Sequence, residues 1–178
     1  MTAMPPGRSQ TRRNHSSSSP DIITVTDCIA TLSRANKLRE MDLVFQEAVE
    51  RGIVLGNTMD LAWEVDFSKL PLPVARAACR YLMHKLLYKR PKEISDMCFI
   101  TGVGKAQQLR KDTSSLHRSK TSSNVLEMKD PTTSLRDFIQ GVLETDFTPS
   151  LSSIIPKRAK GTVVVERQEL ENWLMQQE

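Results

Sequence analysis

The chain has 178 residues, 39% of them hydrophobic and only 5% aromatic, which suits one ordinary domain with a modest core. Its formal net charge is +4, and no apolar run approaches the roughly 18 residues that a membrane span needs. The N-terminus lacks the apolar stretch of a secretory signal, and the three scattered cysteines argue against a disulfide framework. We therefore expect a protein that neither spans a membrane nor is exported, with its cysteines reduced and in the core.

Residues 1–20 carry three arginines and no acidic residue, and they show no hydrophobic periodicity. This composition is similar to that of an organellar transit peptide, which favours a mitochondrial or plastid location. The alternative is a plain disordered tail on a cytoplasmic protein. Both interpretations predict that residues 1–20 lie outside the folded part.

Residues 21–56 have the apolar spacing of two short helices. The apolar positions of the two faces are Val25, Cys28, Ile29 and Leu32, then Met41, Val44, Phe45, Ala48 and Val49. Asn36 interrupts the pattern between the two sets, and Gly52 ends the second one. The segment is predicted to form a helical hairpin.

Residues 60–176 alternate between strand and helix patterns, which predicts an α/β fold with a two-layer β-α-β-α-β sandwich that follows the hairpin. The strands are expected at Trp63–Phe67, Met97–Ile100 and Gly161–Val165. One helix follows Pro71 and Pro73, another begins at the capping sequence Ser134-x-x-Asp137, and a last one carries Leu170, Trp173 and Leu174.

Two stretches carry positive charge. A series at intervals of four residues predicts a cationic ridge on the first of these helices, with an ordinary solvated face as the alternative; it consists of Arg76, Arg80 and His84. Residues 105–130 are predicted to form a disordered basic loop within the α/β part. Between residues 105 and 120 its cations are Lys105, Arg110, Lys111, Arg118 and Lys120.

The second strand runs into Thr101-Gly102-Val103-Gly104. Glycine reaches positive φ without a clash, so a Gly-x-Gly turn can expose backbone N–H groups to a phosphate, although many such turns bind nothing. Because two strands joined by one helix run parallel, we expect Asp66 and Gly102 to meet at the carboxyl ends of adjacent strands.

The stretch TVTDCIATLSRANKLREMDLVFQEAVERGIV, at residues 24–54, resembles one pentatricopeptide repeat. Residues 60–176 resemble the Smr (small MutS-related) domain. One hallmark of that family, Thr-Gly-x-Gly, is intact at residues 101–104. The other, Leu-Asp-x-His, reads Val65-Asp66-Phe67-Ser68, so the acid is kept and serine replaces histidine.

The resemblance implies a nucleic-acid-binding protein, since some Smr proteins are metal-dependent endonucleases and pentatricopeptide repeats bind single-stranded RNA. It implies that Asp66 holds a divalent cation, Mg²⁺ or Mn²⁺, or takes a proton. It also implies that Thr101, Gly102, Val103 and Gly104 contact phosphate, with the basic loop, Arg76 and Arg80 adding charge. Ser68 titrates far above neutrality and cannot shuttle a proton. Cleavage would therefore need His84 or His117 to replace the motif histidine, or a metal ion to substitute for it, and the simplest alternative is a site that binds without cutting.

Three hypotheses follow from these residues. The first is a binder of nucleic acid, most simply single-stranded RNA and otherwise DNA, with weak or no nuclease activity. The second is an endonuclease that cuts RNA or branched DNA with a metal ion. The third is a protein-interaction module whose helical hairpin binds a partner helix.

Overall fold

The computed structural model describes residues 20–54, 62–102 and 134–177. The segment 1–19, the whole of the predicted basic loop, Val103 and Gly104 therefore lie outside the described residues, and the predictions for them are not tested. Within the described ranges the fold is mixed α/β, with five helices and one three-stranded sheet. No helix in these ranges is long and apolar enough to cross a bilayer.

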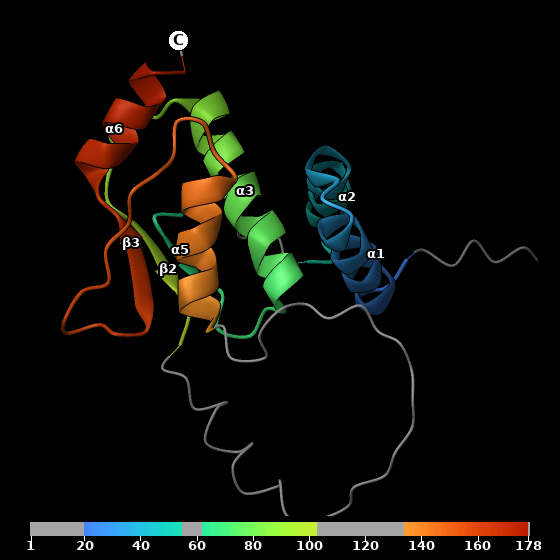
Figure 1. Ribbon diagram of the computed structural model, residues 1–178. Coiled ribbons are helices and arrows are strands. Elements are labelled where there is room, and N and C mark those ends of the chain that lie inside the picture. The colour runs from blue at the N-terminus through green and yellow to red at the C-terminus, as the bar shows by residue number, and fades with distance from the viewer. Residues whose placement is uncertain (1–19, 55–61, 103–133, 178) are drawn as a thin grey trace, which may run out of the picture.

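The two helices predicted at the start are present as α1 (Ile22–Arg34) and α2 (Leu38–Glu50). The Asp21 side chain caps α1 by accepting a hydrogen bond from the Thr24 backbone N–H at 2.8 Å. Asn36 makes the turn between the helices with a φ of +52°, in the left-handed region that asparagine tolerates. The hairpin packs against α3 (Leu72–Lys89), as Figure 1 shows.

The sheet has the order β1-β2-β3, formed by β1 (Glu64–Asp66), β2 (Met97–Ile100) and β3 (Thr162–Val165). β1 and β2 are parallel, as expected for strands joined by one helix, whereas β3 runs antiparallel to β2. The remaining helices are α5 (Leu135–Thr145) and α6 (Arg167–Met175). Ser134 caps α5 by accepting from the Asp137 N–H at 3.2 Å, so the predicted cap is confirmed.

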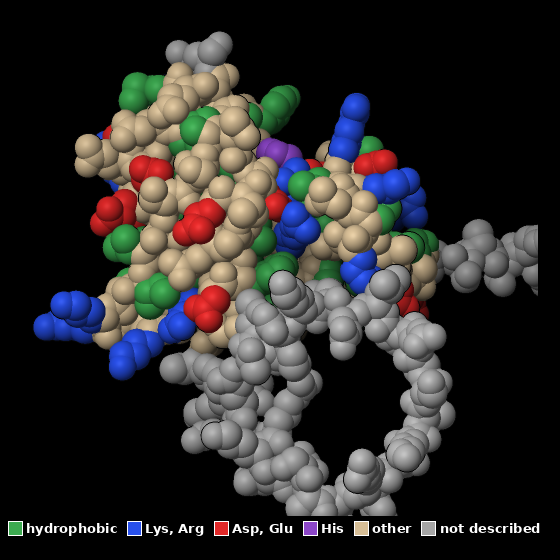
Figure 2. Space-filling view, viewed as in Figure 1, with side chains coloured by type: hydrophobic (Ala, Val, Ile, Leu, Met, Phe, Trp, Pro, Cys, Tyr) green, Lys and Arg blue, Asp and Glu red, His purple; other side chains and the backbone are tan. Residues whose placement is uncertain are grey.

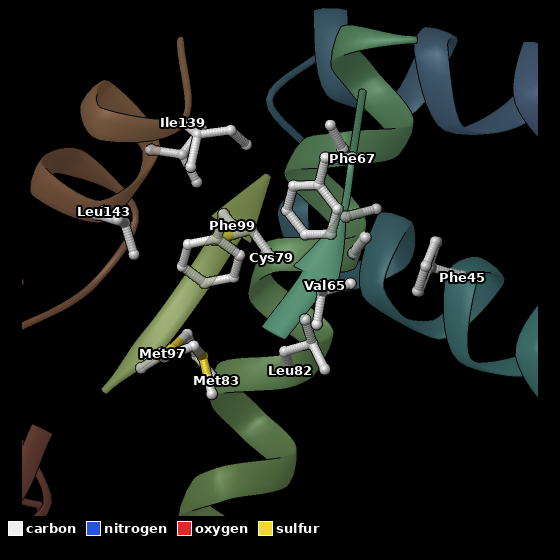
Figure 3. Close-up of a cluster of buried hydrophobic side chains, with 14 of the residues drawn as sticks. Phe45, Val65, Phe67, Cys79, Leu82, Met83, Met97, Phe99, Ile139 and Leu143 are labelled. Atoms are coloured by element: carbon white, nitrogen blue, oxygen red, sulfur yellow. The ribbon is translucent and has the colours of Figure 1, made fainter. Parts of the chain in front are cut away.

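The core fills the space between the sheet and helices α3 and α5, and it continues into the hairpin and α6. Alternate residues of β1 and β2 are buried in it, because side chains of a strand point to opposite faces in turn. Figure 3 shows Phe99 of β2 in one cluster with Cys79 of α3 and Ile139 of α5. Phe67 stacks on Phe99 with ring centroids 5.3 Å apart. The opposite face of the sheet carries Glu64 and Asp66, which are exposed.

The cysteine interpretation is partly wrong. Cys79 is buried, Cys98 is half-buried, and Cys28 is exposed on α1. Cys28 has the helical spacing of the apolar face, but it lies on the side of the hairpin that α3 does not cover, beside Leu43 and Val44 of α2. Periodicity alone does not show which edge of an apolar stripe is covered by another helix and which stays exposed.

Candidate nucleic-acid interface

The carboxyl ends of β1 and β2 lie side by side. Asp66 is opposite Ile100 in the parallel register, and the Phe67 N–H donates to the Ile100 carbonyl at 2.8 Å. The chain then continues directly into Ser68 on one side and Gly102 on the other. The predicted proximity of Asp66 and Gly102 is therefore confirmed, while the roles that the resemblance implies for them stay predictions.

Asp66 is an exposed carboxylate held in a local turn. Its Oδ1 atom accepts a hydrogen bond from the Ser68 backbone N–H at 2.8 Å. Hydrogen bonding from Ser68, through its side chain and backbone, lowers the pKa of Asp66 below its ordinary value. Asp66 is thus a charged hydrogen-bond acceptor at neutral pH, and Ser68, also exposed, is its neighbour in place of the motif histidine.

Gly102 is a position where the structure requires glycine. Its φ is +77°, and a Cβ atom added there would lie 3.2 Å from the Cβ of Ser68. Both the left-handed backbone and the contact with Ser68 disfavour a side chain. The glycine thus lets β2 turn sharply while Ser68 stays close.

The Thr101 donors are turned toward β3 rather than toward solvent. Thr101 is buried, and its N–H and hydroxyl donate to the Gly161 carbonyl at 2.7 and 2.9 Å. The Gly102 N–H donates to the same oxygen at 3.1 Å. These three donors, which the resemblance assigns to phosphate, have a protein partner in this structure.

A cationic loop that the sequence analysis did not single out lies beside this turn. Lys157, Arg158 and Lys160 precede β3, are exposed, and form no ion pair with any described residue. They line a groove of about 450 Å³ with Ile100, Gly102 and Thr162. Figure 2 shows Lys and Arg side chains at the lower left of the molecule, over the loop that leads into β3.

A signal for this loop was present in the sequence, since Lys-Arg-Ala-Lys stands directly before the β-branched strand. Three cations in four residues are a common surface feature and predict little alone. They become a candidate binding surface because β3 pairs with β2, which brings residues 157–161 beside Gly102. That antiparallel pairing joins residues about 60 positions apart and cannot be read from spacing.

The predicted ridge of Arg76 and Arg80 is corrected by the structure. Arg80 is buried, forms a two-point ion pair with Asp42 of α2 at 2.9 and 2.7 Å, and donates to the Asp146 carbonyl at 3.1 Å. Arg76 makes a two-point pair with Asp146, both distances being 2.7 Å. Both guanidinium groups therefore join α3 to neighbouring elements instead of facing solvent as a ridge.

The described residues around Asp66 do not form a binding site for a resident metal ion. Among the described residues, no group of three or more His, Cys, Asp or Glu side chains is placed to hold one. Asp66 also accepts the Ser68 N–H, which occupies part of its coordinating capacity.

An apolar groove of about 300 Å³ lies between α1 and α2, and none of its lining residues belongs to α3. Its apolar lining includes Val25, Cys28, Leu43, Val44 and Ile53. Leu43 is 60% exposed, which is unusual for a large apolar side chain that has a partner. Among the described residues, this apolar groove contrasts with the cationic groove beside Gly102.

Comparison with known proteins gives no match to a family model, to a curated protein or to a solved structure.

Proposed function

We propose that this chain binds single-stranded RNA through the groove at the end of the sheet, and that it binds without efficient cleavage. The observation that carries the proposal is the position of Lys157, Arg158 and Lys160, exposed and without ionic partners among the described residues, on a groove next to Gly102. Unpaired cations on a concave surface attract the phosphate backbone, which supplies most non-specific affinity for nucleic acid.

The order of elements supports the Smr interpretation as part of the same proposal. An acidic residue ends β1, Thr-Gly follows β2, and α3 connects the two strands. We propose that residues 60–176 are an Smr-like β-α-β-α-β sandwich, that α1 and α2 are a pentatricopeptide-like repeat, and that the protein acts in a mitochondrion or plastid. These statements rest on sequence motifs and on their compatibility with a mixed α/β fold.

The preference for binding over cleavage rests on the missing proton donor. Phosphodiester cleavage needs an activated nucleophile and a protonated leaving group. Asp66 has a lowered pKa and is ionised at neutral pH, and Ser68 does not titrate near neutrality. His84, which could have replaced the motif histidine, lies on α3 with its Nδ1 atom 3.9 Å from the Asp42 carboxylate, in the contact with the hairpin.

The test is a binding titration of the purified full chain with labelled single-stranded RNA at several salt concentrations. We expect affinity that falls steeply with salt, because each neutralised phosphate of a single strand contributes a slope of about 0.7. No binding, or binding that salt does not change, would contradict the proposal. The same RNA and a supercoiled plasmid are incubated with Mg²⁺ or Mn²⁺, and repeated turnover there would favour the endonuclease alternative.

Ser68→His is the matched variant for the cleavage assay, since it places an imidazole beside Asp66 with a pKa near neutrality. Cleavage by this variant alone supports a binding site that lacks one catalytic group. Cleavage by the natural chain, at a rate that Ser68→His does not raise, shows that the natural site has another proton donor.

A protein-interaction module is the second candidate function, and the apolar groove between α1 and α2 favours it. Such a groove suits the apolar face of an amphipathic helix. Leu43→Glu separates the two functions, because it places a charge in the helical groove and leaves the cationic groove unchanged. If the RNA proposal is right, this variant binds RNA as the natural chain does.

A further inference from the structure

We infer that the loop of residues 156–162 is the element that contacts the phosphodiester backbone, and that Thr101 is the positioning residue that holds this loop in place. The inference rests on the proposed function and makes it specific. It assigns the phosphate contacts to side chains of the loop instead of to the backbone of the Thr-Gly turn.

The loop consists of two consecutive turns, which we call the double turn. The Ala159 N–H donates to the Pro156 carbonyl at 3.0 Å, and the Thr162 N–H donates to the Ala159 carbonyl at 2.9 Å. Lys157 and Arg158 are the central residues of the first turn, and Lys160 is a central residue of the second. Central residues of a turn project from the loop, so this backbone presents all three cations outward.

The double turn is anchored at its base. Ile154 and Val164 form an antiparallel bridge, with N–H to carbonyl distances of 2.8 and 2.9 Å in the two directions. Val164 belongs to β3, which is itself paired with β2. The loop between them therefore has a fixed origin on the sheet.

The second anchor is at the end of the double turn that joins β3, where the Gly161 carbonyl accepts from the Thr101 N–H, the Thr101 hydroxyl and the Gly102 N–H. A carbonyl oxygen has two lone pairs, so three donors saturate it. Because Thr101 is buried, breaking its hydrogen bond to Gly161 would leave the hydroxyl without a partner, which costs free energy. The turn after β2 thus holds the double turn.

Two anchors reduce the conformational freedom that the loop would lose on binding. A preorganised site pays less ordering entropy for each contact, so its cations contribute more affinity than the same charges on a free chain. Gly102 contributes through its backbone, because its N–H donates to the Gly161 carbonyl at 3.1 Å. The cations supply the attraction, and Thr101 and Gly102 supply the geometry.

The first experiment compares two triple variants of the full chain that change the charge equally. Lys157→Gln/Arg158→Gln/Lys160→Gln removes the cations of the double turn, and Lys37→Gln/Arg39→Gln/Lys92→Gln removes three exposed cations elsewhere. Fluorescence anisotropy is recorded with labelled oligo(U), oligo(A) and single-stranded DNA. We expect the first variant to lose at least tenfold in affinity for every probe and its salt slope to fall by about 2, and the second to change little.

The second experiment tests Thr101. Thr101→Val removes the hydroxyl at nearly constant volume, and Thr101→Ser keeps it. We expect Thr101→Val to weaken RNA binding three- to tenfold, Thr101→Ser to restore most of this loss, and Thr101→Val to have no further effect when the three loop cations are already Gln. Thermal unfolding of each variant confirms that the protein is folded at the assay temperature.

The outcomes separate this inference from the proposed function. If the natural chain binds RNA with salt dependence but the loop triple variant binds equally well, the phosphate contacts lie elsewhere and the inference is wrong, while the proposed function stands. If Thr101→Val weakens binding equally in both backgrounds, the positioning role is wrong. If the natural chain binds no probe, the proposed function itself fails.

Discussion

Ser68 and Gly102 face each other across the ends of two parallel strands, so closely that a Cβ atom on the glycine would lie 3.2 Å from the Cβ of the serine. Together with the positive φ of Gly102, this closeness explains why glycine stands in the turn after β2. It also couples the two motif segments, because a larger side chain at either position would displace the other segment. Gly102 therefore has a structural requirement that is independent of any ligand.

Gly102→Ala is expected to destabilise the protein by about 1–3 kcal/mol, because alanine resists a φ of +77° and its methyl group crowds Ser68. Gly141→Ala is the matched control. Gly141 lies inside α5, and an added Cβ there meets nothing within 4 Å. This second change should stabilise the protein by about 0.5–1 kcal/mol, since glycine is costly within a helix.

The two alanine variants are compared by urea unfolding monitored by circular dichroism. We expect the free energy of unfolding to fall for Gly102→Ala and to rise for Gly141→Ala. Equal stability of Gly102→Ala and the natural chain would mean that the turn after β2 relaxes at little cost, and the packing described for Ser68 would not hold in solution.

Arg80→Ala should cost about 3–5 kcal/mol, because it leaves the carboxylate of Asp42 and the carbonyl of Asp146 without their partner in a poorly solvated contact. Arg51→Ala, which removes an exposed pair with Glu47, should change the stability by less than about 0.5 kcal/mol. The free energy of unfolding is measured for both. An Arg80→Ala cost as small as that of Arg51→Ala would contradict the buried ion pair.

Much of the fold was predictable because local patterns determine it. The helical stripes, the cap at Ser134, and the parallel pairing expected for two strands joined by one helix all came from residues close together in the sequence. The antiparallel direction of β3 was not predicted. It depends on how the chain returns to the sheet after α5, and neither composition nor periodicity contains that information.

The candidate site was predicted in part. The proximity of Asp66 and Gly102 followed from topology, but the partners of the charged residues did not. Arg76 and Arg80 looked like a solvent-facing ridge because their spacing is helical, and only the tertiary structure shows Asp42 and Asp146 against them. Conversely, the cations before β3 gained significance only when strand pairing placed them beside Gly102.

Ser68→Ala should raise the pKa of Asp66 toward its ordinary value, since the serine hydroxyl is the largest cause of the lowering. A carboxyl with a lowered folded-state pKa stabilises the fold above its unfolded pKa, and this contribution is lost as the pH falls below about 4. Carbon-13 NMR titration of the Asp66 carboxyl measures the change. An unaltered midpoint would show that the backbone N–H of Ser68 alone sets the pKa.

His84→Gln should flatten the dependence of stability on pH between about 7.5 and 5.5. Desolvation lowers the pKa of His84 below 6.5, outweighing the nearby Asp42 carboxylate, which raises it, while Arg80 lowers it further. The unfolded chain then binds a proton more readily than the folded one, so stability falls as the pH drops through about 6.5. Urea midpoints at several pH values should decline for the natural chain and decline less for His84→Gln. A natural chain that becomes more stable across this interval would show instead that the Asp42 carboxylate dominates and that the folded protein favours the protonated imidazole.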